Sequence, residues 1–88
     1  MRIREGFILK EIADTFVVVP VGDNMVDFSL MITINETGAF LWNCLKEDKT
    51  RDELADALMN EYEGATREEM LEDIDAFTSL LKENNILE

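Results

Sequence analysis

The stretch Phe28–Asn35, FSLMITIN, passes from an alternating strand pattern into the cap of a helix. The alternation divides the strand residues into one face of Phe28, Leu30, Ile32 and Ile34 and another of Ser29, Met31 and Thr33. Because successive side chains of a strand point to opposite faces, we expect the first set to face the core and the second to lie on a partly open surface. Asn is favoured at the N-cap, so a helix is predicted to begin just after Asn35.

Two more runs of β-branched and aromatic residues lie before this stretch and predict two further strands. The first run is FILKEI at 7–12, and the second is TFVVV at 15–19. Pro20 and Gly22 are expected to stop the second strand, because PVGDN at 20–24 has the composition of a turn. The three segments together predict an antiparallel sheet of three strands.

Helical spacing replaces strand alternation after residue 35. Capping boxes are predicted at Thr50 with Glu53 and at Thr66 with Glu69, and Gly64 is placed to end the helix between them. The three expected helices carry apolar stripes of Phe40, Leu41, Cys44 and Leu45, of Leu54, Ala57, Leu58 and Tyr62, and of Met70, Leu71, Ile74, Phe77, Leu80 and Leu81. Two capped helices joined by a short turn indicate a helix-turn-helix. The sequence therefore predicts one α+β domain over residues 1–88, a winged helix-turn-helix in which the sheet precedes three helices.

The composition limits where the chain acts and what it binds. No apolar run approaches the roughly 20 residues that cross a bilayer, the N-terminal residues lack the apolar segment of a secretory signal, and one cysteine suits a reducing compartment. We therefore expect a cytoplasmic protein without a membrane partner. The 20 acidic and 8 basic residues give a formal net charge of −12. This charge favours basic partners or serves only to maintain solubility, and both interpretations stay open.

The residue that serves most often as general base and as transition-metal ligand is missing. The chain has no histidine and a single cysteine, Cys44, which lies on the apolar stripe of the first helix. A catalytic thiol needs a base, so we expect Cys44 to be a core residue. The acidic residues at 68, 69, 72, 73 and 75 match no calcium-binding loop and are expected to form a solvated helix face. We predict no enzyme activity, no metal site and no cofactor.

The third helix would be the DNA-reading helix of a helix-turn-helix protein. Between Arg67 and Glu83 it carries six acidic residues and two basic ones, Arg67 and Lys82. Binding to the phosphate backbone needs the opposite charge, so the sequence argues against a nucleic-acid partner. A winged-helix transcriptional regulator is kept as the alternative function.

The strand at 28–34 offers a different binding surface if it lies at the edge of the sheet. An open edge presents unpaired backbone groups, to which an extended peptide can add as a further strand. Met31 and Thr33, with Met70, Asp73 and Phe77 across a groove, could then select the peptide. The competing interpretation is that this strand is paired on both sides and the methionines belong to the core. An open edge could also pair with a second copy, giving a homodimer through the edge strand or a swapped hairpin.

Several segments, taken in order, resemble the PqqD family. The resemblance is carried by residues 7–12 (FILKEI), 17–22 (VVVPVG), 31–42 (MITINETGAFLW), 52–54 (DEL), 61–62 (EY), 73–77 (DIDAF) and 80–81 (LL). It covers nearly the whole chain, and the turn Ile34-Asn35-Glu36 into the first helix is its most specific part.

The resemblance implies a recognition element for ribosomally made, post-translationally modified peptides. The leader of a precursor peptide would add beside the strand at 28–34 and rest against the helix at 70–81, and the domain would present it to a modifying enzyme, often a radical S-adenosylmethionine enzyme. The implied peptide-binding residues are Phe28, Ser29, Leu30, Met31, Ile32, Thr33, Met70, Asp73, Ile74, Phe77 and Leu81. The hairpin from Pro20 through Asp27 is longer than is usual in proteins that build pyrroloquinoline quinone, so the identity of the product is left open.

Overall fold

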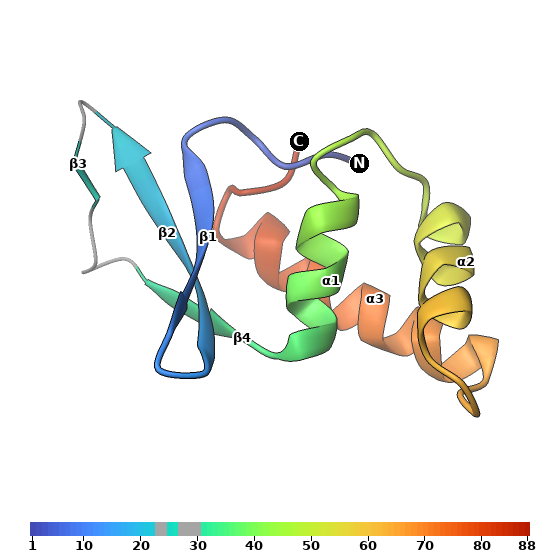
Figure 1. Ribbon diagram of the computed structural model, residues 1–88. Helices are drawn as coiled ribbons and strands as arrows, with labels where there is room; N and C mark the ends of the chain where they lie inside the picture. Colours follow the sequence, from blue (N-terminus) through green and yellow to red (C-terminus); the bar gives the residue numbers. More distant parts are fainter. Residues whose placement is uncertain (23–24, 27–30) are drawn as a thin grey trace.

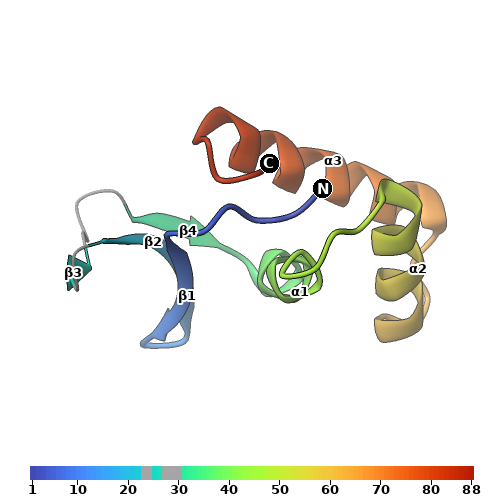
Figure 2. The same ribbon diagram turned by 90° about the horizontal axis from the view of Figure 1, so that it is seen from above.

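The computed structural model describes residues 1–22, 25–26 and 31–88. A small antiparallel sheet is followed along the chain by three helices, which lie to one side of it (Figure 1). The helix α3 runs along the side of the molecule on which β4 lies (Figure 2). The predicted fold class, α+β with a sheet ahead of three helices, is confirmed by this arrangement.

The sheet is built around a central strand. β2 (Thr15–Gly22) pairs on one side with β1 (Phe7–Ile12) and on the other with β4 (Ile32–Ile34), both antiparallel. A short strand β3 (Met25–Val26) pairs with the far end of β2. The turn between β1 and β2 places Ala13 and Asp14 at positive φ, 50° and 66°, as the favoured two-residue hairpin turn requires.

The second strand is longer than the sequence predicts. The expected turn at 20–24 is wrong in its first part, because Pro20–Gly22 continue β2. The amide of Val21 donates to the Gly6 carbonyl at 2.7 Å, so donors at odd-numbered positions of β2 face β1. The nitrogen of Pro20 faces the other side, and its missing N–H therefore removes no bond to β1. The strand predicted at 28–34 is present as β4, Ile32–Ile34. The prediction is wrong at Met31, which lies outside the strand, and positions 28–30 are outside the described residues.

The helices begin at the predicted caps. α1 (Glu36–Cys44) starts after Asn35, whose side chain accepts from the Gly38 amide at 2.7 Å. α2 (Arg51–Glu61) has the complete predicted capping box at Thr50. α3 (Arg67–Glu83) has only half of its predicted box, in which the Thr66 hydroxyl accepts from the Glu69 amide at 3.1 Å. No helix among the described residues is long and apolar enough to cross a membrane.

The core lies where α3 packs against the other two helices and the sheet. Its fully buried members include Leu41, Leu45, Leu54, Leu58, Ile74, Leu81, Ile86 and Val18. Ile86 and Leu87 dock on this core as the end of the chain, and Leu87 bridges to Ile3. Surface ion pairs also join α2 and α3: Arg51 pairs with Asp75, and Arg67 pairs with both Asp52 and Asp56. The fold thus packs α3 against α1 and α2, on the side of the molecule where β4 lies.

Candidate functional site

The strand β4 lies at an edge of the sheet that the described residues form. Among the described residues it bonds to β2, and no strand lies along its other edge. Thr33 stands opposite Val17. The backbone N–H and C=O of Val17 point toward β1, because odd-numbered residues of β2 bond to β1, as Val21 does to Gly6. The N–H and C=O of Thr33 therefore point away from the sheet. Within residues 1–22, 25–26 and 31–88 the predicted edge is open at this position, and it faces the side occupied by α3.

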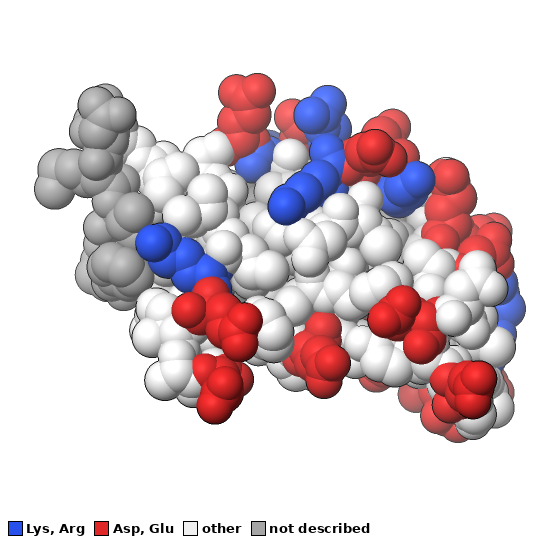
Figure 3. All heavy atoms as spheres, viewed as in Figure 1, with Lys and Arg blue, Asp and Glu red and all other residues white. Residues whose placement is uncertain are grey.

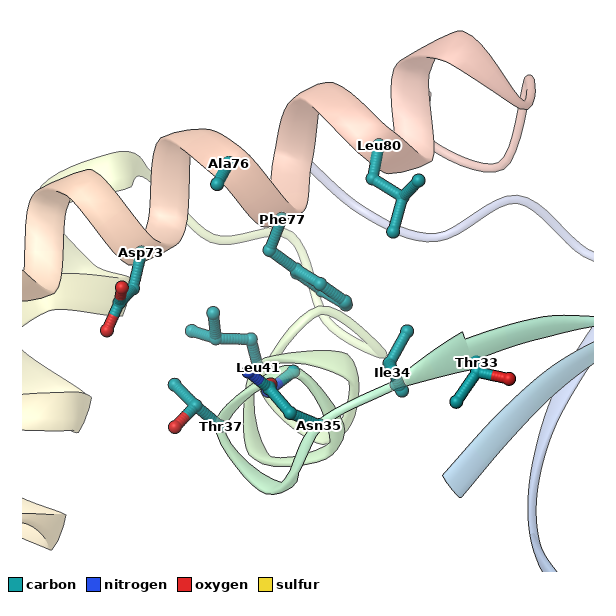
Figure 4. Close-up of a pocket in the computed structure, with 10 residues that line it drawn as sticks. Thr33, Ile34, Asn35, Thr37, Leu41, Asp73, Ala76, Phe77 and Leu80 are labelled. Atoms are coloured by element: carbon teal, nitrogen blue, oxygen red, sulfur yellow. The ribbon is translucent and has the colours of Figure 1, made fainter. Parts of the chain in front are cut away.

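A groove of about 250 Å³ lies between this edge, the start of α1 and one face of α3 (Figure 4). It is lined by Thr33, Ile34, Asn35, Thr37, Gly38, Leu41, Asp73, Ala76, Phe77 and Leu80. We call this hollow the β4–α3 groove. A strand added at the edge of β4 would place every second side chain in it.

The lining of the β4–α3 groove follows directly from local structure. From α3 it receives positions 73, 76, 77 and 80, which lie on one helix face because their spacing is i, i+3, i+4 and i+7. From α1 it receives Gly38, where an added Cβ would stand 3.1 Å from the Phe77 ring and 3.2 Å from Asn35 Oδ1. The absence of a side chain at Gly38 therefore lets Phe77 close against α1 and shape the floor of the groove.

One carboxylate lies at an end of this hollow. Asp73 hangs from α3 at the end marked by Thr37, whereas Leu80 lies near Thr33 and Ile34 (Figure 4). Asp73 is exposed and has no hydrogen bond or ion pair among the described residues. Asp75, two positions further on, accepts hydrogen bonds from Nε and Nη2 of Arg51, each at 2.8 Å, and this hydrogen bonding lowers the pKa of Asp75. The two neighbouring acids therefore differ in availability to a ligand.

A second pocket lies at the other end of β4. Its volume is about 390 Å³, and it is lined by Phe7, Val18, Pro20, Met31, Ile32, Asn84 and Ile86. Met31 is 46% exposed, so this side chain belongs to the surface. The prediction that Met31 and Thr33 lie on an open face and Ile34 in the core is confirmed by their exposure.

The sequence-predicted binding residues fall into four groups. Thr33, Asp73 and Phe77 line the β4–α3 groove, and Met31 and Ile32 line the second pocket. The other predicted residues of α3, namely Met70, Ile74 and Leu81, are buried at 8%, 0% and 0% exposure and line neither the groove nor the second pocket. Phe28, Ser29 and Leu30 lie outside the described residues.

Several residues that line the β4–α3 groove were not predicted as binding residues from the sequence. They are Ile34, Asn35, Thr37, Gly38, Leu41, Ala76 and Leu80. The helical spacing from Asp73 would have located Ala76 and Leu80, because positions three, four and seven residues apart share a face. No signal in the sequence identifies Gly38 as a packing site, since its role depends on a ring from another helix.

The remaining candidates for chemistry do not form a site in the described part of the chain. Cys44 is half-buried, and burial raises the pKa of its thiol, which lowers the fraction of reactive thiolate. No group of three or more potential metal ligands is found among the described residues. In the view of Figure 3, acidic side chains are spread over the helical part, and the basic ones gather mainly beside the chain ends.

These features define a class: small winged helix-turn-helix domains with an open strand edge beside a grooved helix. The family model of coenzyme PQQ synthesis protein D (PqqD) matches residues 16–87. The chain belongs to this family, and the resemblance found in its sequence is confirmed.

A solved structure, "TbiB1 in Complex with the TbiA(beta) Leader Peptide", has the same fold. Its TM-score is 0.74 at 24% sequence identity, and the alignment covers 100% of this chain and 95% of the other. No curated protein matches the chain.

Proposed function

We propose that this protein is a non-catalytic recognition element that binds the leader of a ribosomally made precursor peptide by strand addition at β4. The observation that carries the proposal is the outward-facing backbone of Thr33 beside the β4–α3 groove. Backbone hydrogen bonds to β4 would give affinity, and the groove would select side chains. Membership of the PqqD family supports the same function, as does the shared fold of TbiB1, which was solved in complex with a leader peptide.

The partner enzyme forms the second part of the proposal. After binding, the domain presents the peptide to a modifying enzyme, which we expect to be a radical S-adenosylmethionine enzyme acting in the cytoplasm. We propose that the domain itself supplies no catalytic group. The lack of histidine and the half-buried position of Cys44 support this part of the proposal. Co-purification of the domain with the enzyme encoded beside it, with and without the precursor peptide, tests this step.

The alternative function, binding of duplex DNA, is not favoured by any observation. The helix α3 keeps its six acidic residues against two basic ones, and five of those six lie in its first half. A surface of this charge repels phosphate.

Nuclear magnetic resonance tests strand addition most directly. The ¹⁵N-labelled protein is titrated with the leader of the precursor peptide encoded beside the gene. We expect amide shifts at 31–35 and along the groove face of α3, at 73–80. Unchanged spectra over these residues at saturating peptide would refute the proposal. Titration with duplex DNA at moderate ionic strength is the parallel control, for which no shifts are expected.

The open edge can also pair with a second copy of the chain. Such pairing would use the same backbone groups as the peptide, so the two should compete. Sedimentation of the protein with and without peptide distinguishes them, because peptide binding at β4 should convert any dimer to a peptide-bound monomer.

A further inference from the structure

The proposed function does not say which kind of group the charge of Asp73 binds. The arginines of the helical part are engaged elsewhere: Arg51 pairs with Asp75 at 2.8 Å, and Arg67 pairs with Asp56 at 2.7 Å. Asp73 has no such partner among the described residues, although it lines a groove whose floor is apolar. A carboxylate in this position can accept charge-assisted hydrogen bonds from a cationic side chain.

The direction of α3 fixes where that charge lies along an added strand. α3 runs from Asp73, at the end of the groove where Thr37 lies, to Leu80, at the end where Ile34 and Thr33 lie (Figure 4), and this is opposite to the direction of β4. The other strand pairs of this sheet are antiparallel, and a peptide that continues the pattern would run with α3. Its N-terminal part would then lie near Asp73.

The spacing between positions follows from standard geometry. One turn of helix, from Phe77 back to Asp73, covers about 5–6 Å at ~1.5 Å per residue. Two residues of a strand cover about 7 Å, so side chains at alternate positions of the peptide meet Asp73 and then Phe77. Two residues further on, the next inward side chain reaches the level of Ile32 and the second pocket.

We propose that the groove reads a peptide of the pattern basic–x–apolar–x–apolar, in which Asp73 binds the Lys or Arg side chain. The first apolar side chain enters the β4–α3 groove against Leu41, Phe77 and Leu80, and the second enters the pocket beside Met31 and Ile32. This inference rests on the proposed function, strand addition at β4, and adds a specificity-determining residue to it.

A peptide selection tests the pattern without knowledge of the natural ligand. A random 12-residue library displayed on messenger RNA is selected against the wild-type protein, Asp73→Asn and Glu72→Gln. Glu72 is the matched control, because it is an exposed acid on α3, next to Asp73, that lines neither the β4–α3 groove nor the second pocket. Both variants change the net charge equally, which separates local binding from general attraction to an acidic protein.

The inference predicts that wild type and Glu72→Gln both enrich the full pattern, whereas Asp73→Asn enriches the apolar pair alone. The role of Asp73 would be overturned if all three proteins selected the same basic preference, or if both variants lost it equally. Either result would leave strand addition at β4 unaffected. Enrichment of no peptide by the wild type would overturn the proposed function together with the inference.

Affinities give the size of the effect. A selected peptide and its version with norleucine in place of the basic residue are each titrated by fluorescence anisotropy against wild type and Asp73→Asn. An exposed ion pair contributes little, so we expect a loss of about threefold to fivefold from either change in ~50 mM salt, and no further loss from both together. The difference should shrink at about 0.5 M salt. Additive losses from the two changes would refute a direct contact.

Discussion

Replacement of Thr33 by proline should weaken peptide binding without unfolding the sheet. The N–H at this position points away from β2, so its removal costs no bond within the protein. Pro is tolerated at the edge of a sheet for that reason, and it keeps the preceding Ile32 in the extended conformation that β4 already has. The change therefore acts on the open edge alone.

The expected magnitude follows from the one bond removed. A backbone hydrogen bond contributes about 0.5–1.5 kcal/mol net, and a carbonyl left unpaired in the complex adds a penalty of about 1–3 kcal/mol when it is buried. The edge is partly exposed, so we expect a total loss of about 1–2 kcal/mol, which corresponds to about 5- to 30-fold weaker binding.

The assay is calorimetric titration with the leader of the encoded precursor peptide. Thr33→Val is the control, because it changes the side chain and keeps the N–H; its affinity should stay within about twofold of wild type. Urea unfolding of each variant verifies that the sheet is intact. If Thr33→Pro is folded and binds as tightly as Thr33→Val, the peptide does not add to β4 and the reasoning fails.

Three further predictions concern the groove and its support. Gly38→Val places a branched side chain against Phe77, whose ring stands 3.1 Å from an ideal Cβ at position 38. The free energy of unfolding in urea should fall by about 1–3 kcal/mol, and calorimetry should show weaker binding of the same leader. Unchanged affinity would mean that the Phe77 ring does not contact the peptide. Ile74→Ala removes a fully buried side chain and should lower the free energy of unfolding by about 2–5 kcal/mol, and a loss well below 1 kcal/mol would contradict its place in the core. Hydrogen bonding to Arg51 lowers the pKa of Asp75 from its ordinary value of 3.8, so its contribution is present above that value and lost as pH falls through the lower, folded-state pKa. Wild type should accordingly be more stable than Asp75→Asn at neutral pH but not in strong acid, as acid titration of both by circular dichroism will measure; a difference that persists unchanged in acid would exclude the ion pair as its source.

The elements that could be predicted from the sequence are those set by local patterns. The helix that begins after Asn35 and the complete capping box at Thr50 follow from side chains that bond within one turn. The end of β2 could not be predicted. Pro20 fits within this strand because its nitrogen faces away from β1, and that direction is set by how β1 and β2 pair. That information belongs to the sheet as a whole.

The candidate site divides in the same way. Thr33 and Phe77 could be placed in the groove from alternation and helical spacing, and both line it. Ile74 and Leu81 share the apolar stripe with Phe77, so the pattern alone could not separate groove from core. The separation depends on how α3 is rotated against α1, which the close approach of Phe77 to Gly38 determines.

The pairing of the two chain ends has a practical consequence for tethering. Ile3 bridges to Leu87, and both ends lie at the side of the molecule away from the start of α1 (Figure 1). A short flexible linker from Glu88 could join this domain to an enzyme and raise the local concentration of captured peptide to about the millimolar range. Attachment at Met1 would instead replace the contact of its amino group with Asp48 at 2.7 Å. Fusions are therefore best made at the C-terminal end, where they leave the edge of β4 and the β4–α3 groove free to bind the peptide.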